Sequence, residues 1–70
     1  MSYWNYRVVH HDPDGGFDIH EIYYDEDGTI TEWSVDAVHP QGDTLAELKE
    51  DAEVYVRAIL APSLTESELP

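Results

Sequence analysis

Cysteine is absent from this chain of 70 residues, so neither a disulfide bond nor a cysteine-type zinc site can support the fold. Basic residues are also scarce. Arg7, Lys49 and Arg57 stand against 16 aspartates and glutamates, and the formal net charge at pH 7 is −13. A surface of this sign repels nucleic acids and anionic membranes. We therefore expect no direct binding to nucleic acid or membrane.

Long apolar runs are missing as well. No stretch of the chain approaches the roughly 20 apolar residues that a membrane-spanning helix needs. Residues 1–5 contain no basic segment followed by an apolar run, so we expect no signal peptide and a cytoplasmic location. The length fits one small domain, without linkers or internal repeats.

Three short runs rich in β-branched and aromatic residues predict strands at residues 3–10, 17–24 and 30–38. Clusters of turn-forming residues separate them, which predicts two consecutive hairpins. We expect the first hairpin to pair His10 with Phe17, and the second to pair Asp25 with Thr29. Alternation along each strand then gives one apolar face. That face carries Trp4, Tyr6, Val8, Phe17, Ile19, Glu21, Tyr23, Thr31, Trp33, Val35 and Ala37.

The clearest helix signal follows the strands. Thr44 and Glu47 fit a capping box, and Ala61-Pro62 is typical of a helix end. Between them, apolar residues recur at helical spacing and predict a stripe that covers the apolar sheet face. The predicted fold class is α+β: a three-stranded antiparallel β-meander packed on one face by a C-terminal α-helix (β-β-β-α). Residues 1–62 are expected to form a single domain, and residues 63–70 a flexible acidic tail.

Two features suggest more than a bare scaffold. Glu21 falls on the covered face between Tyr6 and Trp33, which makes it a candidate partly buried carboxylate; alternatively, it lies near the sheet margin and reaches water. The opposite sheet face mixes aromatic and aliphatic groups with an arginine, as protein interfaces do. The candidate interaction face consists of Tyr3, Asn5, Arg7, His20, Ile22, Tyr24 and Glu32.

Sequence motifs that would indicate catalysis or metal binding are incomplete or missing. The segment from Tyr23 to Ser34 echoes a calcium-binding EF-hand loop, but Tyr23 and Ser34 replace two of its carboxylate ligands. Arg7 is expected beside His20, where its charge disfavours a cation, so we expect surface histidines. No phosphate loop or nucleophile elbow is present. We therefore predict no catalytic residues, no metal site and no cofactor. The expectation of surface positions applies to all four histidines of the chain: His10, His11, His20 and His39.

The segments Trp4–Val9, His20–Gly28 and Gly42–Leu45, together with Trp33, resemble a family of small acidic bacterial proteins to which no activity is assigned. That resemblance implies one compact bacterial domain. Gly15-Gly16-Phe17 and Gly42–Leu45 are also similar to the strand-turn and helix-start signatures of HicB-type antitoxins, which implies binding to a small basic RNA-cleaving toxin. The chain departs from those antitoxins in its second hairpin, and we expect neither their strand after the helix nor their DNA-binding segment.

The leading hypothesis is a non-catalytic protein-interaction module, whose protein partner is expected to be basic. One alternative is an antitoxin-like or nucleic-acid-mimicking inhibitor of a basic protein. Another is a small metal-dependent hydrolase that uses Glu21 with His20 or His39, although neighbouring strand residues face opposite sides. A homodimer formed through the exposed sheet face is a further possibility.

Overall fold

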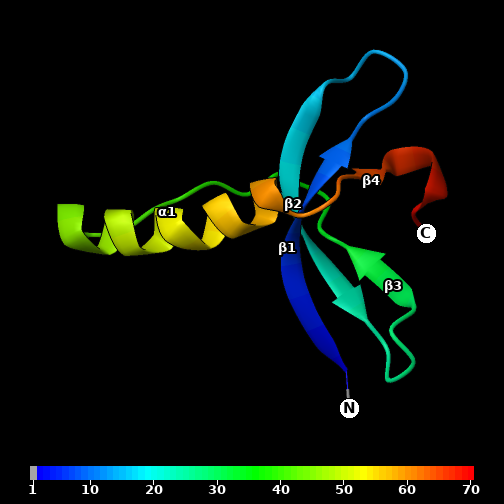
Figure 1. Cartoon of the computed structure of the whole chain (residues 1–70), viewed down its shortest axis with the longest axis horizontal. Coiled ribbons are helices and arrows are strands. Elements are labelled where there is room, and N and C mark those ends of the chain that lie inside the picture. Colours follow the sequence, from blue (N-terminus) through cyan, green and yellow to red (C-terminus); the bar gives the residue numbers. More distant parts are fainter. Residues whose placement is uncertain (1) are drawn as a thin grey trace.

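The computed structural model describes residues 2–70, which form one mixed sheet, one α-helix and a short 3-10 helix. The strands are β1 (Tyr3–His10), β2 (Phe17–Tyr24), β3 (Ile30–Trp33) and β4 (Leu64–Thr65); α1 spans Leu45–Leu60 and the 3-10 helix η1 spans Glu66–Glu68. The strand order is β3-β2-β1-β4, and the sheet is strongly curled (Figure 1). The α+β class is confirmed. The three predicted strands pair antiparallel in the predicted order, but the sheet is mixed, because β4 adds a fourth strand that runs parallel to β1.

The first hairpin has the predicted register. His10 lies opposite Phe17 and Tyr3 lies opposite Tyr24, so β1 and β2 pair along their whole lengths. The turn closes with a hydrogen bond from the His11 amide to the Gly16 carbonyl (2.8 Å). Gly16 has a φ of 75°, which a residue without a side chain adopts at little cost.

The second hairpin starts as predicted and then slips. The Asp25 amide donates to the Thr29 carbonyl (2.9 Å), and Gly28 has a φ of 83°. A β-bulge between Tyr23 and Tyr24 then shifts the register, so that Trp33 lies opposite Ile22. A shift of one residue moves a side chain to the other face of a sheet. The predicted placement of Trp33 beside Glu21 is therefore wrong, and β3 ends at Trp33 instead of extending to residue 38.

The core lies on the sheet face that was expected to be exposed. Val9 and Ile22 are fully buried, and Tyr24 is nearly so. Four half-buried side chains pack against these three: Ile30, Trp33, Leu64 and Leu69. Two of them come from the segment after the helix. This C-terminal cover removes the face from water and makes it the centre of the fold.

The predicted tail is consequently part of the domain. Leu64 pairs with Val9 and Thr65 pairs with His10, which attaches β4 to the free edge of β1. The Trp33 indole N–H also donates to the carbonyl of Pro70 (2.8 Å). A two-residue strand has no periodicity that a sequence pattern can reveal. The division at residue 62 therefore does not match the structure.

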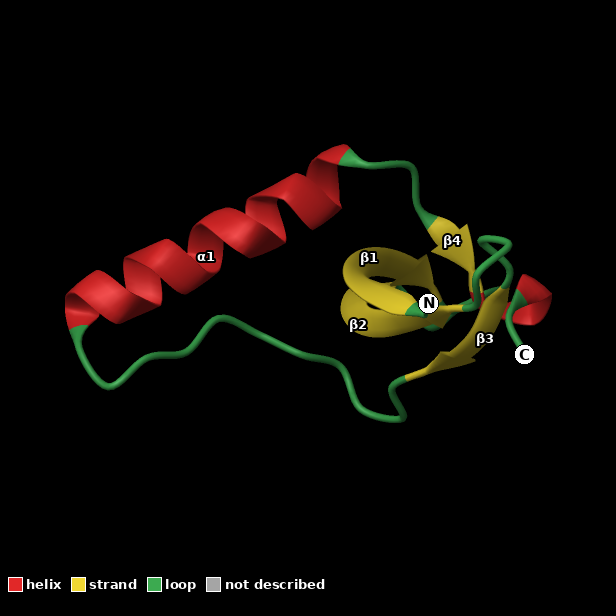
Figure 2. Ribbon diagram, turned by 90° about the horizontal axis from the view of Figure 1, so that it is seen from below, coloured by secondary structure: helices red, strands yellow, loops and turns green. Residues whose placement is uncertain are grey.

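Helix α1 begins where predicted. The Thr44 hydroxyl accepts from the Glu47 amide (3.1 Å), and the Glu47 carboxylate accepts from the Asp43 amide (3.0 Å). Tyr55 and Ala58 are the buried residues of the helix, and the Tyr55 ring packs against Tyr6 at a tilt of 34°, with ring centroids 4.6 Å apart. The first turns of α1 project beyond the sheet (Figures 1 and 2). The prediction that the apolar stripe covers the sheet is thus right only for its C-terminal part.

Candidate functional site

The predicted interaction face divides into exposed and buried residues. Tyr3, Asn5 and Glu32 are exposed and Arg7 is half-buried. The other three members, His20, Ile22 and Tyr24, are buried, so the expectation of one open face is wrong. The reason is that Leu64 in β4, Leu69 and the shifted Trp33 cover this face, and the strand pattern predicted none of these contacts.

Exposed apolar side chains gather instead on the helix. We use the name "α1 stripe" for five of its residues, which lie at spacings that share one side of a helix. In the two most open cases the side chain keeps 66% and 80% of its surface exposed. Acidic residues stand around the stripe: Glu47, Glu50, Asp51 and Glu53. The α1 stripe consists of Leu45, Leu48, Val56, Ile59 and Leu60.

A groove continues from the stripe onto the sheet. Its volume is about 550 Å³, and it lies between β1, β2, the segment around Pro40 and the end of α1. Val8, Phe17, Ile19 and Ile59 supply its apolar lining. Phe17 is exposed at 67%. The apolar surface open to a partner thus lies on the face that was expected to form the core.

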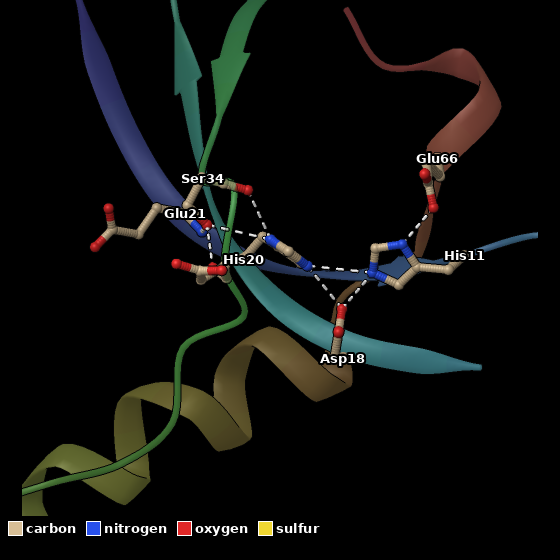
Figure 3. Close-up of polar contacts among 7 residues, drawn as sticks. His11, Asp18, His20, Glu21, Ser34 and Glu66 are labelled. Carbon is tan, nitrogen blue, oxygen red and sulfur yellow. Dashed lines mark hydrogen bonds and ion pairs between the residues drawn. The ribbon is translucent and has the colours of Figure 1, made fainter. Parts of the chain in front are cut away.

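Glu21 is half-buried and hydrogen-bonded. Its carboxylate accepts a hydrogen bond from the hydroxyl of Tyr23. This hydrogen bond, together with burial, raises the pKa of Tyr23 above its usual value. In Figure 3 the Glu21 carboxylate points away from the two histidines on the other side of the strand. That direction argues against a hydrolytic pair made of Glu21 and His20.

A cluster of two histidines and a carboxylate forms at the opposite side of β2. His11 Nε2 lies 2.6 Å from Asp18 Oδ1, and His20 Nε2 lies 2.8 Å from the same oxygen. The two Nε2 atoms are 3.2 Å apart. Figure 3 shows the two Nε2 atoms pointing toward one another, with the Asp18 carboxylate within reach of both. The side chain of His20 is 2% exposed, whereas those of His11 and Asp18 are 21% and 41% exposed.

Each ring has a further partner on its Nδ1 atom. His20 Nδ1 donates to the carbonyl oxygen of Ser34 (2.9 Å). His11 Nδ1 donates to the carboxylate of Glu66, in η1. The hydrogen bonds to Glu66 and then Asp18 raise the pKa of His11, against the opposing effect of its partial burial. The C-terminal segment is therefore linked to the first hairpin through a charged group.

The burial of His20 corrects the expectation of a surface histidine at that position, and the cluster itself follows from the strand pairing. Asp18 and His20 are two residues apart on one strand, and His11 follows Val9 by two, so all three share a face. The predicted register already contained this juxtaposition. The expected obstacle, Arg7, lies opposite His20 as predicted. However, its guanidinium reaches away to the carbonyl of Pro62.

The remaining candidates have local roles. Asp25 Oδ1 accepts from the amides of Asp27 and Thr29 (2.9 and 3.0 Å), so the EF-hand echo is a hairpin turn held by its own carboxylate. His10 stacks on Phe17 with ring centroids 4.3 Å apart. His39 is exposed and its Nδ1 contacts the carbonyl of Pro40.

Comparison with protein-family models, with curated proteins and with solved structures finds no match for this chain. Among the described residues, no helix has the length and apolar character required to cross a bilayer.

Proposed function

We propose that this chain is a non-catalytic protein-interaction module that binds a basic protein through the α1 stripe and the adjoining groove. The observation that carries the proposal is the exposure of the stripe. Leucine, valine and isoleucine side chains recur along one side of α1, yet only Tyr55 and Ala58 of the helix are buried. Exposed apolar side chains gathered on one side of a helix in this way are typical of a binding site.

The accessible surface of the chain is larger than expected for a monomer of its mass, which supports the proposal that part of it is normally covered by a partner. The accessible surface is 5057 Å². A folded monomer of 8.0 kDa is expected to expose about 4,450 Å², from the scaling of surface with mass. The excess is about 600 Å², close to the roughly 800 Å² that each partner contributes to a standard interface. A partner that covered the stripe would bring the exposed area to the ordinary range.

Charge selects the kind of partner. The net charge of −13 means that a second copy would bring the same sign to the contact. On α1 itself, Lys49 and Arg57 are the basic residues, against four acidic ones. A basic protein would instead find apolar contacts surrounded by complementary charge, which favours fast association and correct orientation. We propose the cytoplasm as the setting, and inhibition of that basic protein as one form the interaction could take.

The test is a tagged pull-down from lysate of the native bacterial host, with matched substitutions. Leu45→Glu and Ile59→Glu place a charge in the stripe, and Val35→Glu makes the same chemical change at a side chain 95% exposed in the loop after β3. We expect wild type and the Val35 variant to retain one basic protein that both stripe variants lose. High salt should weaken the capture. A protein retained equally by all four chains would contradict the proposal, as would a stable homodimer in light scattering that Leu45→Glu dissolves.

A further inference from the structure

We propose that His11, Asp18 and His20 form a binding site for a divalent transition-metal ion, with zinc as the best fit. The ligand atoms are the two Nε2 nitrogens and one carboxylate oxygen, and all of them lie within 4.8 Å of one another. The site is on the sheet face opposite the α1 stripe, and it does not depend on the interaction proposed above.

The hydrogen bonds settle which ring nitrogens face the site. The Ser34 carbonyl can only accept, so His20 Nδ1 carries a hydrogen. The ionised Glu66 carboxylate also accepts, so His11 Nδ1 carries one too. In the neutral form of each ring, Nε2 then presents a lone pair. Two lone pairs and a carboxylate then converge on one point, and a zinc ion there would take the place of the proton that His11 Nε2 shares with Asp18.

The distances suit a first-row metal. Nitrogens bound to zinc at 2.0–2.1 Å in tetrahedral geometry are about 3.3 Å apart. The two Nε2 atoms are already 3.2 Å apart. Asp18 Oδ1, at 2.6 and 2.8 Å from them, has to withdraw by about half an ångström to reach the same geometry. Its half-exposed side chain is free to do so, whereas His20 is fixed by burial.

The outer contacts are those that metal-binding histidines use. Imidazole ligands commonly donate their second N–H to a backbone carbonyl or a carboxylate, which sets the tautomer and the orientation of the ring. His20 donates in this way to the backbone carbonyl of Ser34, and His11 donates to the carboxylate of Glu66. Two nitrogens and one oxygen favour zinc and its neighbours over magnesium or calcium, which prefer oxygen ligands.

Three protein ligands leave at least one position for water or another molecule. Zinc sites with three protein ligands keep such a position, whereas structural sites have four. The exposed edge of the cluster, at Asp18 and His11, is where this position would open to solvent. The acidic charge of the whole chain raises the local concentration of cations around it.

Cobalt(II) absorption and zinc titration calorimetry test the site in the full chain, with excess magnesium present to suppress loose binding to surface carboxylates. We expect one ion per chain and a tetrahedral-type visible spectrum with cobalt. Asp18→Asn and His11→Gln should weaken zinc binding more than tenfold, and Glu66→Ala, which removes the acceptor of His11 Nδ1, should weaken it by roughly 10- to 100-fold, as loss of an outer contact does. His39→Gln removes an exposed histidine outside the cluster and serves as the matched control.

Ring-nitrogen NMR on the unmodified chain gives a readout that needs no variant. Zinc should shift the Nε2 signals of His11 and His20 and leave those of His10 and His39 in place. Binding that His39→Gln weakens as much as Asp18→Asn would overturn the proposal. So would unchanged His11 and His20 signals at saturating zinc, which would mean that the two rings share only a proton. Partner capture through the α1 stripe is scored separately, so that either proposal can fail alone.

Discussion

Replacing isoleucine by valine at two positions tests which face of the sheet is the core. Ile22 is fully buried against Val9 and Tyr24, and Ile59 on α1 is 61% exposed. The substitution removes the same methylene group in both cases. At a buried site it costs 0.5–1.5 kcal/mol, so we expect about 1 kcal/mol for Ile22→Val. Ile59 has about two fifths of its surface covered, and about 0.8 kcal/mol per buried methylene gives about 0.3 kcal/mol there.

Urea unfolding monitored by tryptophan fluorescence measures both losses. A domain of this length has about 4–10 kcal/mol of stability in total, so a difference of about 0.7 kcal/mol is measurable in the unfolding midpoint. If the helix stripe formed the main core, as the strand and helix patterns first predicted, Ile59→Val would cost as much as Ile22→Val or more. That result would refute the assignment of the core to Val9, Ile22 and Tyr24.

Two further predictions concern individual side chains. Burial, and to a smaller extent the hydrogen bond to Tyr6, raises the pKa of Tyr55 above its unfolded value of about 10. The neutral Tyr55 therefore stabilises the fold below pH 10, and this stabilisation is lost as the pH rises further. Tyr55→Phe should therefore flatten the fall in stability between pH 10 and 12, and an unchanged slope in urea midpoints would count against this cause. Gly28 has a φ of 83°, so Gly28→Ala should cost about 1–2 kcal/mol in the same assay; a neutral result would mean that the turn changes its conformation.

Local signals predicted the parts of the fold that depend on neighbouring residues. The first hairpin follows from alternation and a turn cluster, and the helix start follows from Thr44, whose hydroxyl accepts from the Glu47 amide, while the Glu47 carboxylate reaches back to the amide of Asp43, one residue before the cap. These features need only a few adjacent residues. The bulge between Tyr23 and Tyr24 is different, because an extra residue in one strand has no distinct local pattern.

The choice of core face was beyond the strand pattern for a physical reason. Both faces of the β1–β2 hairpin carry apolar groups, with Trp4, Tyr6 and Val8 on one and Val9 and Ile22 on the other. Alternation alone cannot rank two apolar faces. The face that becomes the core is the one that the C-terminal segment packs against. That segment is remote in sequence, because β4 lies 54 residues or more from β1, the strand it joins. The cluster of His11, Asp18 and His20 differs in this respect, because the predicted register already brings its three residues together; only its outer contact from Glu66 comes from the distant segment.

The C-terminal segment therefore offers a direct test of how the domain is held together. Leu64 is half-buried against the core and pairs with Val9, whereas Leu60, at the end of α1, is 80% exposed. Leucine-to-alanine changes in full cores cost 2–5 kcal/mol. For the half-buried Leu64 we expect about 1–2 kcal/mol, and for Leu60→Ala a value near zero.

Removing residues 63–70 should cost more than Leu64→Ala, because it also exposes Val9 and Ile22 and removes the hydrogen bonds made by Glu66 and Pro70. Urea midpoints and amide exchange of β1 would measure the loss. If the shortened chain kept wild-type stability and β1 amides stayed protected, residues 63–70 would be the free tail that the sequence first suggested. The core would then have to be covered by something else, and the exposed α1 stripe would be the first surface to examine.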